Sequence, residues 1–343
     1  MQAPRPAPRP SATYAQLLLL AGLLLAAFGS AAQRHGNVAV QHLATYGRRP
    51  DNTEPMYGPA PKSKRHQRID ARFVRESVAL YGSRDSAAHE MVRAGWHYLK
   101  RRDPGTAMKR FNQAWLLDSL LPDPYFGFAT VLDLQHRSAE AARCHALGEA
   151  RHPDHRFAPR YYVPVAECKA FYHDHDGAIA AYQRYTQWLP TRADGYQQLG
   201  YHLMTVNRDS AALATLTKAI ALDPTSAVTI NNRGWLHFQN KRYLLALSDF
   251  SAAIDVQPDY ISAYVNRGLA RQASGSREGA RDDFAAAVRL NPKSAELRLY
   301  LAEAHQQLSD TAAACSEYRA AQQLNPPTDL AAELAARVRA TCP

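Results

Sequence analysis

The feature that most constrains this chain is a proline that returns at a fixed interval. Five of these prolines are spaced 34 residues apart, and a sixth stands 37 residues before them: Pro153, Pro190, Pro224, Pro258, Pro292 and Pro326. A period of about this length is typical of a repeat architecture, in which each short unit buries its apolar face only by stacking on its neighbours. We therefore expect an elongated array rather than one globular core.

Other positions keep the same interval. A small residue recurs at Ala107, Ala141, Ala178, Ala212, Ala246, Ala280 and Ala314. Four positions later most units have a large residue, at Phe111, Tyr182, Leu216, Phe250, Phe284 and Tyr318. Twelve positions before the alanines stand Gly95, Ala129, Ala166, Gly200, Gly234, Gly268 and Ala302. Small residues let two helices approach closely, and proline ends a helix because its ring cannot continue the hydrogen-bond ladder.

This pattern resembles the tetratricopeptide repeat family. The resemblance implies an all-α fold, a right-handed superhelical solenoid of about seven helix-turn-helix repeats. The repeats would cover residues 88–121, 122–155, 159–192, 193–226, 227–260, 261–294 and 295–328. The large residue of each second helix would fill the space against the next repeat. Residues 56–86 and 107–118 also resemble a group of exported bacterial tetratricopeptide proteins of unassigned function.

The third repeat departs from the pattern. Residues 156–158 are additional, and Pro164 would fall inside the first helix of this repeat. Because proline removes a backbone donor and clashes with the preceding turn, we expect that helix to start late, near Val163.

Both ends of the array carry further segments. Residues 329–343 contain an apolar stripe at helical spacing, which predicts a C-terminal cap helix with Thr328 as its N-cap. Residues 70–87 allow an N-terminal capping helix. Residues 33–69 are basic, contain Pro and Gly and show no sustained period, so we expect a mostly disordered linker there.

The first 32 residues have the order of a secretory signal peptide. Two arginines, Arg5 and Arg9, precede an apolar run from Leu17 to Phe28 and then small residues up to Ala32. We expect an exported protein, periplasmic or secreted, with an uncleaved N-terminal membrane anchor as the alternative. No second apolar run of that length occurs, so we expect no transmembrane span in the mature chain.

The formal net charge of +10 is uneven along the chain. Residues 1–72 hold ten Lys and Arg against three acidic residues, a balance of +7, and the remainder carries only +3. The folded array is therefore close to neutral, and we expect no nucleic-acid partner. A second hypothesis is that the basic N-terminal segment binds an anionic polymer or an envelope surface, with the array as a spacer.

In the family that the chain resembles, the first helix of each repeat lines a concave groove, through its positions 2, 5, 9 and 12. The resemblance implies these partner-binding residues: Trp96, Gln197, Tyr201, Met204, Asn231, Trp235, Phe238, Leu269, Gln272 and Glu303. Rings bury area at little entropic cost, and amides can bond an extended backbone, so this surface suits a peptide or a helix. The alternative is that Trp235 and Phe238 only pack against neighbouring helices.

Signals of chemistry are weak. His173 to Asp176 alternate imidazole and carboxylate, and His145, His152 and His155 form a second cluster, but both lie in polar, turn-rich stretches, so we expect no metal site. No phosphate-binding loop, nucleophile elbow or metalloprotease helix occurs. We expect no cofactor and no catalytic residue.

Four cysteines in an oxidising compartment could pair. Cys144 and Cys168 would lie on neighbouring helices of the stack, and Cys315 and Cys342 on the last repeat helix and just past the cap. We expect two local disulfides, with free buried thiols as the alternative. The function that the sequence favours is a non-catalytic scaffold outside the cytoplasm that binds a protein or peptide; the partner and the oligomeric state are not determined by it.

Overall fold

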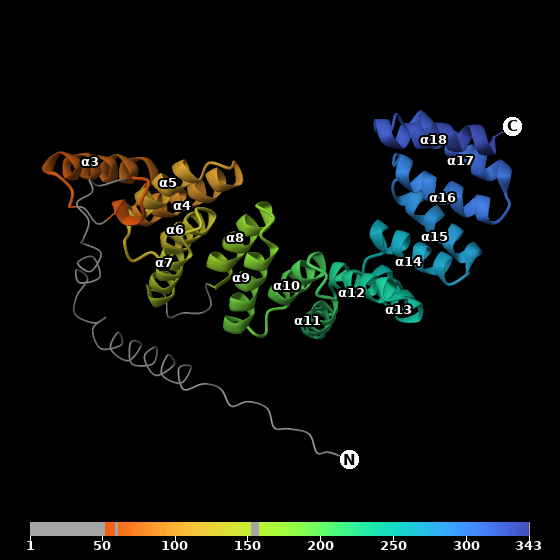
Figure 1. Cartoon of the computed structure of the whole chain (residues 1–343), viewed down its shortest axis with the longest axis horizontal. Helices are drawn as coiled ribbons and strands as arrows, with labels where there is room; N and C mark the ends of the chain where they lie inside the picture. Colours follow the sequence, from red (N-terminus) through yellow and green to blue (C-terminus); the bar gives the residue numbers. More distant parts are fainter. Residues whose placement is uncertain (1–51, 59–60, 152–157, 343) are drawn as a thin grey trace, which may run out of the picture. The chain divides into compact units, whose positions relative to one another are not determined.

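The computed structural model describes residues 52–58, 61–151 and 158–342, and Figure 1 shows their helices. The chain divides into two compact units, an N-terminal unit (Met1–Pro124) and a C-terminal unit (Tyr125–Pro343), which we describe separately. The described residues contain helices and no strand, so the all-α prediction is confirmed. Within the same residues, no helix is both long and apolar enough to cross a bilayer.

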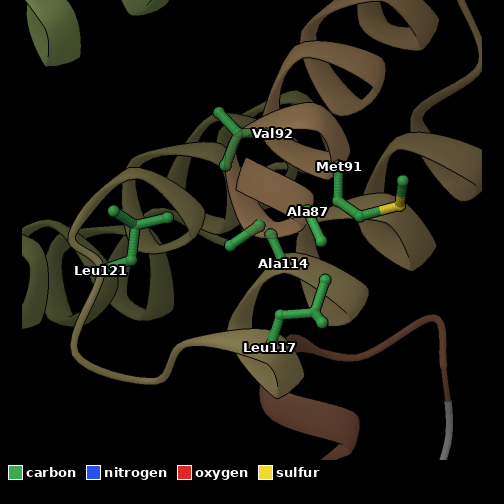
Figure 2. Packing of buried hydrophobic residues seen from close by; sticks show 7 residues of the cluster. Ala87, Met91, Val92, Ala114, Leu117 and Leu121 are labelled. Atoms are coloured by element: carbon green, nitrogen blue, oxygen red, sulfur yellow. The ribbon is translucent and has the colours of Figure 1, made fainter. Parts of the chain in front are cut away.

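The N-terminal unit contains one helical hairpin and a layer packed on it. The hairpin is α4 (Arg84–Lys100) with α5 (Pro104–Leu117), and the layer is the 3-10 turn η1 (Pro55–Tyr57) with α3 (Lys64–Tyr81). A cluster of alanines and larger aliphatic side chains holds the unit together (Figure 2): Ala87, Ala88, Met91, Val92, Ala114, Leu117 and Leu121. Phe73 and Val74 of α3 pack against this cluster.

The C-terminal unit is a run of consecutive helices. They are α6 (Asp123–Leu134, starting at the division between the units), α7 (Ser138–Arg151), α8 (Ala158–Phe171), α9 (His175–Trp188), α10 (Ala193–Thr205), α11 (Asp209–Leu222), α12 (Ala227–Gln239), α13 (Tyr243–Val256), α14 (Ile261–Ala273), α15 (Arg277–Leu290), α16 (Ala295–Gln307), α17 (Thr311–Gln323) and α18 (Thr328–Thr341). From α8 onward each helix contacts the next, and α12 also contacts α10 and α14. The first helices of successive repeats therefore lie side by side.

Close approach of the two helices of a repeat depends on the small residue in the first of them. A Cβ atom placed on Gly234 would lie 2.8 Å from the Phe250 ring, and one on Gly268 would lie 2.7 Å from the Phe284 ring. Both rings are fully buried. The large residue therefore packs on the glycine of its own repeat. It also fills the space against the next repeat, as expected, since Phe284 stacks on Tyr300 with ring centroids 5.5 Å apart.

Each turn between the two helices of a repeat contains one residue in the left-handed conformation. These residues are Arg102, His136, His173, Asn207, Lys241, Gly275 and Ser309, with φ between 57° and 90°. The residue after each donates its N–H to the carbonyl five positions earlier, at 2.8–3.0 Å, which closes the first helix as in a Schellman motif. His173 therefore has a backbone role in the turn.

Three expected boundaries are wrong. Helix α8 runs from Ala158 with Pro164 inside it, rather than starting near Val163; a single proline costs one backbone hydrogen bond and leaves the rest of the helix bonded. Helix α3 begins at Lys64, inside the expected linker, and ends at Tyr81, where the left-handed Gly82 separates it from α4. Thr328 is the first residue of α18, and Pro327 occupies the N-cap position.

The first described residues and the last helix of the chain are held by different kinds of contact. In the N-terminal unit, the fully buried Asn112 donates to the carbonyls of Asn52 and Glu54 and accepts from the N–H of Tyr57, which fixes the segment before α3. Residues 52–58 are therefore ordered against α5, although they fall within the expected linker; residues 1–51 lie outside the described part. In the C-terminal unit, α18 buries Leu334 against Tyr318.

Candidate functional site

The expected groove face is the side of α10, α12, α14 and α16 in the C-terminal unit. Rings gather on it. Trp235 and Phe238 lie one turn apart on α12 with ring centroids 5.3 Å apart, and Phe238 is 5.9 Å from Tyr243 at the start of α13. Tyr201 occupies on α10 the register position that Trp235 occupies on α12, and half of its surface is exposed. Because α10 and α12 contact each other, these rings belong to one surface.

The aromatic residues are not equally open to a partner. Phe238 packs against a buried cluster of Ala246, Phe250 and Ala270, so part of its ring is core. Trp235 is half-buried, and Tyr201 is exposed. For Phe238 the packing alternative therefore applies, whereas Tyr201 and Trp235 keep surface that a ligand can cover.

The amides of the site already bond between repeats. The Nδ2 of Asn266 on α14 donates to Oδ1 of the buried Asn231 at 2.9 Å. The hydroxyl of Ser226, the N-cap of α12, donates to Oε1 of Gln197 at 3.1 Å. These bonds set the register of one first helix on the next, so Asn231 and Gln197 position the surface; of the expected amides, Gln272 is half-buried.

Two arginines on α12 and α14 form ion pairs with aspartates of their own repeats. Arg233 binds the buried Asp249 with nitrogen and oxygen 2.6 Å apart, and Arg267 binds the buried Asp283 at 2.7 Å. A carboxylate so deeply buried needs such a partner, because an isolated charge there would be very costly. The consequence for the site is that these two arginines do not present free charge on the groove face.

The remaining expected residues differ in their surroundings. Met204 is half-buried, and Leu269 packs against the cluster that contains Phe284. Glu303 binds Arg337 of α18 at 2.8 Å, and burial raises the pKa of its carboxyl against the opposing effect of that arginine. Trp96 lies in the N-terminal unit, edge-on to Phe111 with centroids 5.3 Å apart and packed against the cluster of Figure 2. Glu303 and Trp96 thus contribute to packing.

Sequence reasoning missed Leu244 and Leu245. They follow Tyr243 at the start of α13, and 84% and 51% of their surfaces are exposed. The signal that could have found them is the apolar run from Tyr243 to Leu247, which is longer than the stripe that one buried helix face requires. This run adds exposed apolar surface at the start of α13, next to the turn between α12 and α13.

The four cysteines do not form the two expected pairs. Cys315 and Cys342 form a disulfide that fastens the end of α18 to α17. The expected Cys144–Cys168 disulfide is wrong, since both side chains are buried and no disulfide joins them: neighbouring positions in a stack do not make two side chains face each other. Burial raises the pKa of Cys144 to about 12, so its thiol stays protonated. His152 and His155 lie outside the described residues.

Next to His173, both Asp174 and His175 contact other side chains or backbone groups. Asp174 caps α9 through the N–H of Gly177 and pairs with Lys169. His175 contacts the buried His202, with the two Nδ1 atoms 3.3 Å apart. Burial, and then the neighbouring His175, lowers the pKa of His202. In the described part of the chain, no three His, Cys, Asp or Glu side chains gather as metal ligands would.

The helical hairpins, the large side chain that packs on Gly95, Gly200, Gly234 and Gly268, and the period of 34 residues together give this chain the fold of a tetratricopeptide-repeat array. No family model matches it, and neither does any curated protein.

Solved structures match parts of the chain. MamA from Desulfovibrio magneticus RS-1 is 18% identical over 49% of this chain and 95% of its own, with a TM-score of 0.46. YrrB, described as a TPR protein with an unusual peptide-binding site, is 19% identical over 53% and 92%, at 0.41. The first TPR of Spaghetti (RPAP3), solved with an HSP90 peptide, is 28% identical over 34% and 94%, at 0.34.

Proposed function

We propose that this protein is a non-catalytic scaffold that acts outside the cytoplasm and binds a protein or peptide on the face formed by α10 and α12. The observation that carries the proposal is that the exposed Tyr201 and the half-buried Trp235 stand at one register position of two contacting helices. Aromatic side chains with open surface supply much of the binding energy in many interfaces, because they bury a large area with few rotatable bonds.

The chemistry of the surface indicates the kind of segment that it binds. Arg233 and Arg267 are engaged by buried carboxylates, and Gln197 and Asn231 are engaged between repeats. Tyr201 and Trp235 keep aromatic surface open, and Leu244 adds an exposed aliphatic side chain at the start of α13. A segment with two or three apolar side chains fits such a surface better than a highly charged one. The location outside the cytoplasm rests on the order of residues 1–32, which the structure does not describe.

The test is selection of binders from a displayed peptide library on the full chain, followed by affinity measurement on two double variants. Tyr201→Ala with Trp235→Ala removes the open rings but leaves Phe238 and its buried cluster intact. Leu222→Ala with Val256→Ala is the matched control, because these residues are similarly exposed at the ends of the second helices α11 and α13.

We expect the ring variant to lose at least about tenfold in affinity, the scale of one interface hot spot, and the control to stay within about twofold. Helical content and the unfolding midpoint should not change in either variant. Equal binding by both variants would show that the face of α10 and α12 is not the binding site.

A further inference from the structure

Helix α3 presents a row of basic side chains on its outer face. The row consists of Lys64, Arg65, Arg68, Arg72 and Arg75, and all five side chains are exposed. At 3.6 residues per turn they fall within an arc of about 100° and extend along about 17 Å of the helix. We call this set the basic row of α3.

The opposite side of α3 is the one that packs on the hairpin. Phe73 and Val74 contact the buried cluster, and Ser77 is buried. The helix lies against α4 and α5, as Figure 1 shows for these three elements. The basic row therefore points away from the unit to which it is attached, and it is held in one fixed line.

Within the described part of the chain, the only ion pair of the row is that of Arg72. Arg72 pairs with Glu76, but both side chains are largely exposed, and such a pair contributes little. The other acidic residue of the helix, Asp70, lies away from the row and binds Lys62. Four cations at successive turns repel one another and are stabilised by an external anion.

Apolar side chains border the row on one edge. Ile69 and Leu80 follow the arc of the arginines, and 54% and 73% of their surfaces are exposed. Neither side chain assists contact with a nucleic acid, where phosphates are met by basic and hydrogen-bonding groups. A lipid interface suits both kinds of side chain, because phosphates lie at the depth of the arginines and the acyl boundary accepts the aliphatic groups.

We propose that the basic row of α3, with Ile69 and Leu80 at its edge, docks the N-terminal unit on a membrane surface that contains anionic phospholipids. The arginines bind lipid phosphates, and the helix lies parallel to the surface. This activity is separate from the aromatic surface of α10 and α12, so each can fail without the other. The expected basic linker is thus, from Lys64 onward, an ordered docking helix.

The test is flotation of the full chain with vesicles of one part phosphatidylglycerol to two parts phosphatidylcholine, beside vesicles of phosphatidylcholine alone. The second vesicle controls for insertion of the apolar run near the N-terminus, which does not depend on anionic lipid. The variant is Arg68→Gln, Arg72→Gln and Arg75→Gln. The matched control, Arg143→Gln, Arg289→Gln and Lys293→Gln, removes three exposed charges from the C-terminal unit.

We expect a loss of about fivefold in partitioning for each arginine removed near the surface, on the order of 100-fold for the triple variant. The control should stay within about twofold, and half-molar salt should release the wild-type chain because it screens the row. Ile69→Ser with Leu80→Ser should weaken vesicle binding without affecting binding to soluble heparin.

Three outcomes would overturn the proposal. The first is equal flotation of the row variant and the control with anionic vesicles. The second is equal flotation of the wild-type chain with both vesicle compositions. The third is tighter binding to duplex DNA than to anionic vesicles in the same buffer, which would assign the row to a nucleic acid instead.

Discussion

The two compact units hold their capping helices in different ways. The N-terminal unit adds α3 and the η1 turn, held by Asn112 and by apolar contacts, whereas the C-terminal unit adds α18, held by Leu334 and by a disulfide. The sequence of the first unit has 18 Lys and Arg against nine acidic residues, a net +9, and that of the second has 23 against 22, a net +1. Helix α18 thus covers apolar side chains, whereas α3 covers apolar side chains and also carries a charged exposed face.

The largest effect should come from removing the disulfide. Cys315→Ser with Cys342→Ser opens a link between residues 27 apart, and the loop-entropy relation gives about 3.5 kcal/mol as the upper range of the loss in unfolding free energy. Urea unfolding with and without reductant measures this change. Cys144→Ala is the control, because the free thiol should leave the response to reductant unchanged.

Asn112→Ala should remove the hydrogen bonds that hold residues 52–57 in the N-terminal unit. Three hydrogen bonds at roughly 1 kcal/mol each are lost, so we expect about 2–3 kcal/mol, confined to the η1 segment. Amide exchange at Tyr57 should accelerate, while exchange within α18 stays unchanged. Faster exchange in α18 as well would show that the two units unfold as one.

The C-terminal unit should also lose stability on acidification through His202. Its folded pKa is lowered by burial and then by His175, so the neutral form is favoured in the folded state. Stability is therefore fully present above the unfolded pKa of about 6.5, and it falls as pH drops below that value, because the unfolded chain takes up the proton first. His202→Gln should flatten this part of the profile of unfolding midpoint against pH. An unchanged profile would assign the dependence to other groups.

The smallest effect concerns a feature that both units share, the left-handed turn residue. Lys241→Gly should stabilise the C-terminal unit by about 0.5–1 kcal/mol, because glycine adopts positive φ without a Cβ clash. Gly275→Ala should cost about 1 kcal/mol for the same reason. Thermal unfolding of both variants is the measurement, and shifts of the same sign in both would contradict the explanation.

Much of the fold was predictable because the repeat period records packing directly. The positions of Gly234 and Phe250 both repeat every 34 residues, because the small residue leaves the space that the large one fills. The left-handed turns were not predictable, since residues as different as Arg102, Lys241 and Ser309 occupy the same position. What they share is a backbone conformation imposed by the two helices on either side, and no side-chain type marks it.

The position of the candidate site stays a prediction, and the structure adds what surrounds each of its residues. Register assigned Tyr201 and Trp235 to one face, and the structure leaves surface exposed on both. Register could not show that Phe238 enters a buried cluster, or that Glu303 is bound by Arg337. It also gave no reason to single out Leu244, whose exposure depends on how α13 meets its neighbours.

By itself, the sequence determined that this chain is a repeated helical hairpin, because a period in residue size and in proline is a local rule that every copy must obey. The tertiary structure decided which of the side chains at those positions remain open. That choice depends on long-range partners, as where Asn112 meets a segment more than fifty residues away. Such pairs have no period, and only the folded chain brings them together.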